Sequence, residues 1–251
     1  MRVDNWKVDG VVGINRYLCD YYDKRGMPVL RLPTPSDIHA ITSTPREAGS
    51  RDVFRLGYYG TWSVKDGFID MLRAMKLLTE RDRPVELWAE GSPVSKRYMA
   101  RIEGFLQANP QLEDVVKLLG RLPQQELPRA FSPCDAMILS RPLKRFARAG
   151  LPQKVPEYMA MERPIIVTDV GDIPEYVRDR VDGFVVAPDN PSAVADAVER
   201  LMDLPDRGIG MDRSARLRAM EVFDSSMLAE RLLSFLEGIV ARYQSDRRGK
   251  P

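Results

Sequence analysis

The chain has 251 residues, of which 44% are hydrophobic and 29% are charged, a balance typical of a soluble globular protein with one large domain or two ordinary ones. The formal net charge of +2 excludes a general attraction to nucleic acid, and two cysteines with one histidine exclude a His/Cys metal cluster and favour a reducing compartment. No apolar run approaches the roughly 18 residues of a transmembrane segment and the opening MRVDNWKVDG lacks a signal-peptide core, so we expect a cytoplasmic protein, free or peripheral at the inner membrane face.

Residues 1–41 have the pattern of a strand, a helix and a second strand with a proline-rich exit, in VDGVVGINRYLCDYYDKRGMPVLRLPTPSD. One unit of this kind cannot bury both of its faces, so we expect it to belong to a larger assembly. The polar segment 42–52, which contains Pro45 and Gly49, predicts a linker.

Residues 53–222 alternate between short apolar runs and amphipathic stretches. The apolar runs are Val53–Tyr59, Val85–Ala89, Val115–Leu119, Ala136–Leu139, Ile165–Thr168 and Phe184–Ala187. Runs that are apolar on both faces predict buried parallel strands, and the stretches between them predict crossover helices, one of them capped by Asn190. The fold class is therefore α/β, with a Rossmann-like doubly wound parallel sheet.

Residues 223–244 predict a long amphipathic helix. Its apolar positions recur at three-to-four spacing and include Met227, Leu228, Leu232, Leu233, Leu236 and Ile239. The polar end 245–251 predicts a disordered tail.

Two turns at predicted strand ends are candidate sites for binding a phosphate or a nucleobase. The first is GTWSVKDG, residues 60–67, where loop amides and a helix N-terminus favour phosphate and Lys65 adds a charge. It matches neither GxGxxG nor a Walker loop, so a plain turn with a solvated lysine is the alternative. The second is Gly120–Leu122, whose backbone can contact a nucleobase edge while Arg121 stacks or contacts phosphate. Its alternative is a turn arginine in water.

The segment 140–157 is a basic loop that runs into a short helix expected to begin near Gln153. Its cations are Arg141, Lys144, Arg145, Arg148 and Lys154. Cations beside a helix N-terminus favour a diphosphate, and Glu157 can accept two hydrogen bonds from the vicinal hydroxyls of a ribose or hexose. We interpret most of the arginines as solvated, and Lys154 and Glu157 as functional.

The segment 168–175 ends a predicted strand and starts a helix. Asp172 and Glu175 have capping-box spacing, with Pro174 in the first helical turn. This structural role accounts for both carboxylates, so a catalytic pair is disfavoured.

In this order, the motifs resemble glycosyltransferase family 4 and its relatives, which use the two-domain GT-B fold. The resemblance runs from about Val8 to Tyr243, and its most specific part is LPQKVPEYMAMERPIIVTDVGDIPEYV. It implies that residues 53–222 form the C-terminal, donor-binding half. It also implies that residues 1–41 are a remnant of the N-terminal acceptor domain and that the terminal helix crosses back over both domains.

The resemblance implies sugar transfer from a nucleotide-sugar donor, retaining in most of the family, to an unidentified glycan, lipid or small-molecule acceptor. It implies no cofactor and no metal, because fixed charges and dipoles stabilise the departing diphosphate. The residues to which it gives catalytic roles are Lys65, Lys154 and Glu157. The residues to which it gives donor binding are Gly60, Thr61, Gly91, Gly120, Arg121, Leu122 and Gln153.

Within that site, the resemblance places the diphosphate near Gly60, Lys65 and Lys154, the base at the Gly120–Leu122 turn, and the ribose at Glu157.

Two positions depart from the family pattern. Ala149 stands where the family commonly has a donor-contacting glutamate, and Thr61 stands where an arginine often follows the phosphate-loop glycine. Relatives with a Lys-Val/Leu-x-Glu-Tyr motif also lack that glutamate. With most of the acceptor domain absent, the alternative is a degenerate GT-B module completed by a partner chain or a missing segment. A nucleotide-sugar epimerase is a third reading, which the lack of an acid/base pair disfavours.

Overall fold

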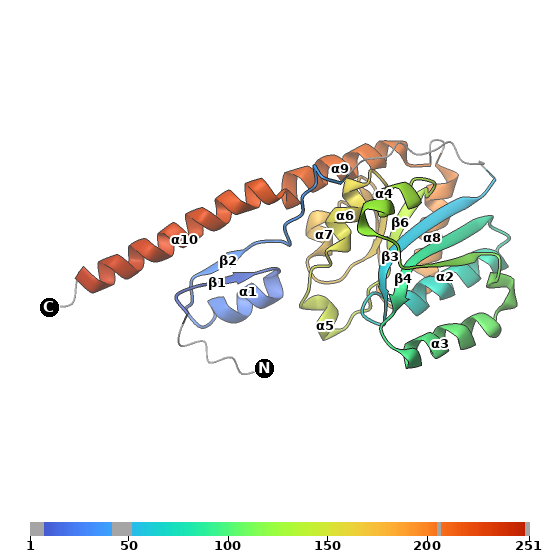
Figure 1. The fold of residues 1–251 in the computed structure, drawn as a ribbon, viewed down its shortest axis with the longest axis horizontal. Helices are drawn as coiled ribbons and strands as arrows, with labels where there is room; N and C mark the ends of the chain where they lie inside the picture. Colours follow the sequence, from blue (N-terminus) through green and yellow to red (C-terminus); the bar gives the residue numbers. More distant parts are fainter. Residues whose placement is uncertain (1–7, 42–51, 205–206, 249–251) are drawn as a thin grey trace.

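The computed structural model describes residues 8–41, 52–204 and 207–248. Its centre is a six-stranded parallel sheet in the order β5–β4–β3–β6–β7–β8 (Figure 1). The strands are β3 (Phe54–Trp62), β4 (Val85–Pro93), β5 (Val116–Gly120), β6 (Ala136–Leu139), β7 (Ile165–Thr168) and β8 (Gly183–Val186). The predicted doubly wound sheet is confirmed, because the strand order reverses between the neighbouring strands β3 and β6.

Helices connect the strands of this sheet and also follow its last strand. The longer ones are α2 (Phe68–Glu80), α3 (Lys96–Gln107), α8 (Pro191–Asp203) and α9 (Ile209–Phe223). The shorter ones are α4 (Leu127–Ala130), α5 (Arg145–Arg148), α6 (Lys154–Ala160) and α7 (Ile173–Tyr176), with 3-10 turns η2 (Pro110–Leu112) and η3 (Gln124–Glu126). Helix α8 begins at the expected cap, since the Asn190 side chain accepts from Ala193 N.

A small unit lies beside the main sheet (Figure 1). It consists of β1 (Val11–Gly13), α1 (Arg16–Asp23) and β2 (Val29–Arg31), with the two strands paired in parallel. The chain then runs to Ser36, whose N–H donates to Phe223 O at the end of α9. Residues 42–51, most of the expected linker, lie outside the described part of the chain.

Helix α10 (Ser225–Arg248) joins this small unit to the main domain (Figure 1). Phe235 and Ile239 pack against Gly10 so closely that an added Cβ there would lie 3.0 Å from both side chains. Arg231 also donates to the Arg31 carbonyl across 3.0 Å. The helix continues to Arg248, past the residue 244 at which the sequence pattern placed its end. Among the described residues, no helix combines the length and apolarity needed to cross a membrane.

The capping-box interpretation of Asp172 and Glu175 is wrong. Asp172 makes no side-chain cap hydrogen bond to α7 within the described chain. Its Oδ2 instead accepts from Arg16 N at 2.7 Å and lies 3.1 Å from Arg31 Nη1. Glu175 pairs with the same two arginines, at 2.6 Å and 2.8 Å. Both carboxylates therefore tie the small unit to the main domain, because α1 and β2 bring two cations to this loop.

Candidate functional site

Strands β3 and β4 carry a pair of facing glycines near their carboxyl ends. Gly60 pairs with Gly91, and both have positive φ angles, 125° and 121°. A Cβ on Gly91 would overlap the carbonyl oxygen of Gly60, and a Cβ on Gly60 would collide with the Lys154 side chain. Glycine is therefore required at both positions, for the backbone conformation and for the close approach of Lys154.

Lys154 reaches the loop after β3 through Asp66. Lys154 Nζ lies 2.8 Å from Asp66 Oδ2, and the two side chains are 18% and 7% exposed. The hydroxyl of Tyr58 lies 2.7 Å from the Thr61 carbonyl oxygen and 3.2 Å from the same carboxylate oxygen, and its single proton is shared between these two acceptors. Sequence reasoning missed Asp66. An acidic residue in a loop expected to bind phosphate was the signal, because its negative charge must be neutralised by a nearby cation before the loop can bind an anion.

Glu157 lies on the first turn of α6, held by two tyrosines of the core. Tyr59 OH donates to Glu157 Oε2 at 2.9 Å, and Tyr158 OH bonds both the N–H and the carbonyl of Tyr59. Burial raises the pKa of Glu157, while the Tyr59 hydroxyl, the Lys154 charge and a hydrogen bond from Gln153 act in the opposite direction. The carboxylate is thus fixed in place and costly to ionise.

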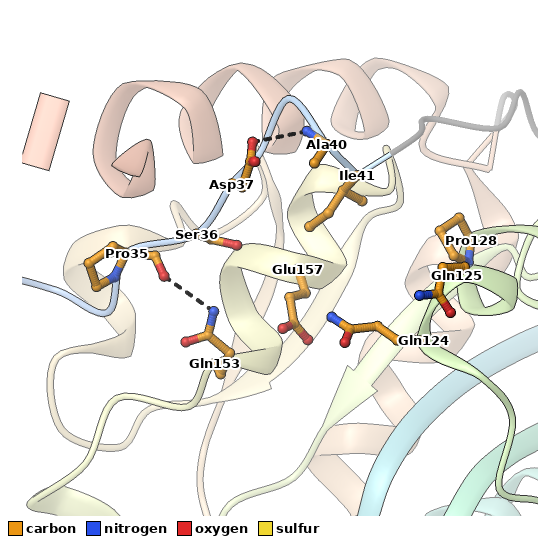
Figure 2. A pocket seen from close by; sticks show the side chains of 10 residues that line it. All are labelled: Pro35, Ser36, Asp37, Ala40, Ile41, Gln124, Gln125, Pro128, Gln153 and Glu157. Atoms are coloured by element: carbon orange, nitrogen blue, oxygen red, sulfur yellow. Dashed lines mark hydrogen bonds between the residues drawn. The ribbon is translucent and has the colours of Figure 1, made fainter. Parts of the chain in front are cut away.

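A cavity of about 550 Å³ opens beside Glu157 (Figure 2). The residues that line it are Pro35, Ser36, Asp37, Ala40, Ile41, Gln124, Gln125, Pro128, Gln153 and Glu157. Figure 2 shows the Glu157 carboxylate and the Gln124 amide pointing into the same opening. Gln153 Nε2 donates to the Pro35 carbonyl across 3.3 Å, which ties the segment after β2 to α6. The cavity therefore lies between the main domain and the segment that leaves the small unit.

The other two expected residues of the β3–α2 loop lie at the surface. The Thr61 and Lys65 side chains are exposed, and neither residue lines this cavity. The cation that the structure brings to Gly60 is Lys154.

Arg141 is not solvated, contrary to our interpretation. It is 0% exposed, and its guanidinium donates to the Lys65 carbonyl at 3.4 Å and the Gly150 carbonyl at 3.0 Å. Nη2 finds no partner within the described residues, and burial lowers the pKa of the group. Arg141 thus holds the β3–α2 loop against the loop after β6.

The arginines of α5 are exposed but not free in water. Arg145 Nε donates to Tyr17 OH at 3.1 Å, and the Arg148 guanidinium lies 5.9 Å from the centre of the Tyr17 ring. Asn15 Nδ2 donates to the Arg148 carbonyl. These contacts hold α1 against the basic loop. Ala149 is the residue directly after Arg148.

The turn expected to face a nucleobase is tied to β4. Gly120 has a φ of 70°, and Arg121 Nε donates to Ser92 Oγ at 2.9 Å. Leu122 N donates to Glu90 Oε1 at 3.0 Å. The sequence reasoning missed Glu90, although a carboxylate at the carboxyl end of a predicted parallel strand lies where such sheets bind ligands.

Within the described residues, no group of three or more His, Cys, Asp or Glu side chains is placed to hold a metal ion.

Residues 53–203 match the family model for glycosyl transferases group 1. The chain belongs to this family. Its six-stranded sheet aligns to part of the two-domain GT-B fold, and its similarity lies mainly in the C-terminal, donor-binding half.

Two curated group 1 relatives illustrate the match. The chain is 27% identical over 149 residues to alpha-D-kanosaminyltransferase of Streptomyces kanamyceticus, a segment that is 59% of this chain and 36% of that protein. It is 29% identical over 142 residues to D-inositol 3-phosphate glycosyltransferase of Streptomyces griseus, covering 54% and 29%. The matched part thus spans about a third of the length of these relatives.

Solved structures share the fold over nearly the whole chain. HepE of Anabaena, solved with UDP and glucose, superposes with a TM-score of 0.79 at 17% identity, covering 93% of this chain and 64% of that one. Sucrose-phosphate synthase of Thermosynechococcus elongatus gives 0.78 at 19% identity, covering 94% and 59%. At these identities the likeness concerns the group 1 fold alone.

Proposed function

We propose that this chain binds the nucleoside diphosphate of a sugar donor and forms the donor-binding half of a glycosyltransferase. The observation that carries the proposal is the convergence of Lys154, Gly60 and Glu157 at the carboxyl ends of the strands. A cation packed against a glycine turn suits a diphosphate, and a fixed carboxylate suits two vicinal hydroxyls. Family membership and the UDP in the HepE structure support the same ligand class.

In this proposal Lys154 neutralises the diphosphate, which approaches the backbone at Gly60 because no Cβ stands in the way. Glu157 accepts from the ribose hydroxyls, with Gln153 beside it. The turn Gly120–Leu122 lies next to the base. Lys65 supplies a second positive charge from the exposed side of its loop, where water screens its attraction to the diphosphate.

The proposed reaction is sugar transfer with retention. The bond from the anomeric carbon to the diphosphate oxygen breaks, and the electron pair leaves with the nucleoside diphosphate. A new bond forms from that carbon to an acceptor hydroxyl, which loses its proton. Lys154 stabilises the developing negative charge on the leaving group, as preorganised cations do in dry sites.

A second candidate function is a binding module that contributes the donor site to a partner chain. Two neighbouring surfaces favour it, because the small unit and α10 expose large apolar side chains. These side chains are Val12, Ile14, Tyr17, Tyr21, Leu233, Leu236 and Val240. In this version the partner supplies the acceptor site, and this chain alone binds the donor but does not transfer the sugar.

Titration calorimetry of the whole chain with UDP, GDP, ADP and CDP tests the donor site. We expect Lys154→Ala and Glu157→Ala each to weaken binding about tenfold or more, since each removes a charged hydrogen-bonding group. Lys76→Ala is the matched control, because Lys76 lies on the outer face of α2 and pairs only with Glu80 within the described residues. Equal binding by all four proteins would refute the site. Transfer by this chain alone would reject the binding-module version.

A further inference from the structure

Glu90 is a buried carboxylate at the carboxyl end of the sheet. It lies in β4, is 6% exposed, and pairs with Gly120, the last residue of β5. The β4–β5 register shifts between Ala89 and Glu90. Buried carboxylates are rare because desolvation disfavours their charged form, so one that persists at a ligand-binding edge requires a reason.

Only part of the hydrogen-bonding capacity of Glu90 is used. Oε1 accepts from Leu122 N at 3.0 Å, and the backbone carbonyl accepts from the Trp62 indole at 3.1 Å. Oε2 makes no hydrogen bond within the residues that the structure describes. A carboxylate has about four acceptor positions, so Glu90 retains capacity for a ligand.

The same contact changes what the Gly120–Leu122 turn offers. The Leu122 N–H, the donor that the turn would present to a base, is occupied by Glu90. Arg121 is likewise held by Ser92. The turn therefore presents a carboxylate acceptor where a backbone donor would otherwise be.

Glu90 lies at the Gly120–Leu122 turn, which the proposed function places next to the base. The charges of Glu157 and Glu90 both contribute to the raised pKa of Tyr59, after burial, and Tyr59 OH donates directly to Glu157. In the proposed function the ribose hydroxyls meet Glu157 and the base lies at the Gly120–Leu122 turn, to which the Glu90 carboxylate is bonded.

The bases differ in the hydrogen-bond donors that their Watson–Crick edges present to a carboxylate. Guanine presents two adjacent donors, N1–H and N2–H, on its Watson–Crick edge. Uracil presents a single N3–H between two carbonyl oxygens, which a carboxylate repels, and adenine and cytosine present one amino donor beside an acceptor nitrogen. An acceptor-only group accordingly favours guanine and disfavours uracil.

We propose that Glu90 determines the nucleobase specificity of the donor site and selects guanine over uracil. This inference rests on the proposed function. The discrimination belongs to Glu90 because the Leu122 N–H, which would otherwise donate to a uracil carbonyl, already donates to Glu90. A hydrogen bond to a charged group corresponds to about 10- to 100-fold in affinity, which sets the expected preference.

The test is calorimetric titration of the whole chain with GDP, UDP, ADP and CDP, repeated with Glu90→Gln. We expect GDP to bind the wild-type chain at least about tenfold more tightly than UDP. In Glu90→Gln we expect that ratio to fall about tenfold, because the amide nitrogen can donate to a uracil carbonyl and loses one acceptor for guanine. Glu103→Gln, on the exposed side of α3, is the matched control and should leave the ratio unchanged.

Three results overturn the inference. If the wild-type chain prefers UDP, ADP or CDP, or if Glu90→Gln keeps the GDP/UDP ratio, Glu90 is a structural tether and the donor site stands without it. If the folded wild-type chain binds none of the four, the proposed function fails and the inference fails with it. Should Glu90→Gln not fold, the wild-type ranking alone decides, since a chain without a guanine preference contradicts the proposal.

Discussion

Lys154 Nζ and Asp66 Oδ2 lie 2.8 Å apart, which joins the first residue of α6 to the loop that follows β3. The pair is shielded from water, so its attraction is stronger than that of a surface ion pair. A diphosphate that binds Lys154 must share this cation with Asp66. The pair thus both positions the proposed phosphate-binding lysine and limits its net charge.

Asp66→Asn should strengthen binding of a nucleoside diphosphate. Asparagine keeps an acceptor for Tyr58 and Lys154 but removes the negative charge, so we expect affinity to rise several-fold, or by about 1 kcal/mol. The gain should shrink as salt is added, because screening weakens the difference. Isothermal titration calorimetry at two salt concentrations measures the gain in affinity and its dependence on salt. Weaker binding instead would mean that Asp66 acts mainly by orienting Lys154.

Glu157→Gln should change the pH dependence of both stability and binding. Burial raises the pKa of Glu157 in the folded chain, so its contribution to stability is present at low pH and is lost as the pH rises through that raised value. Affinity for the ribose should move the opposite way, since the ionised carboxylate is the better acceptor. We expect wild-type affinity to fall on acidification from a higher pH than an ordinary glutamate would give. A Glu157→Gln variant with the same profile as wild type would contradict this assignment.

Gly60→Ala should impair both folding and donor binding. The φ of 125° is strained for any residue with a Cβ, and the added methyl would displace Lys154. We expect a loss of about 1–3 kcal/mol in the free energy of unfolding, with weaker diphosphate binding. Gly104→Ala is the control: it lies within α3 with open space around it, and should stabilise by about 0.5–1 kcal/mol. Urea denaturation of both variants measures the difference.

Asp172→Ala should loosen the small unit from the main domain. The substitution leaves the Arg16 amide and Arg31 without their shared acceptor, at a cost of about 1–3 kcal/mol. Hydrogen exchange should then quicken in residues 8–41 more than in β3–β8. Asp169→Ala, an exposed position in the same loop, should leave exchange unchanged. Unchanged protection in Asp172→Ala would mean that Glu175, the α5 contacts and α10 hold the small unit without Asp172.

The chain order of the elements could be predicted from local pattern. All six apolar runs became strands of one sheet, since a segment that is apolar on both faces has few alternatives to a buried strand. The Asn190 cap could also be predicted, because an N-cap depends only on residues a few positions away in the sequence. Strands β3 and β4 extend further than predicted, to Trp62 and Pro93, because the paired glycines Gly60 and Gly91 continue the ladder beyond the apolar residues.

The partners of the charged residues could not be predicted in this way. Spacing alone favoured a capping box for Asp172, whereas α1 and β2 bring Arg16 and Arg31 to it. Composition alone favoured a solvated Arg141, whereas two converging loops bury it with carbonyl partners.

The sequence by itself determined the α/β class and the strand and helix order, and it predicted Lys154 and Glu157 as donor-site residues, because these depend on periodicity and on short motifs. Only the tertiary structure decided that Lys154 meets Asp66 and that Glu90 occupies the Leu122 amide, contacts that span 88 and 32 residues of chain. The physical reason is that side-chain pairing depends on how separate loops meet at the carboxyl edge of the sheet. That meeting is set by the packing of the whole core and not by the residues adjacent in sequence.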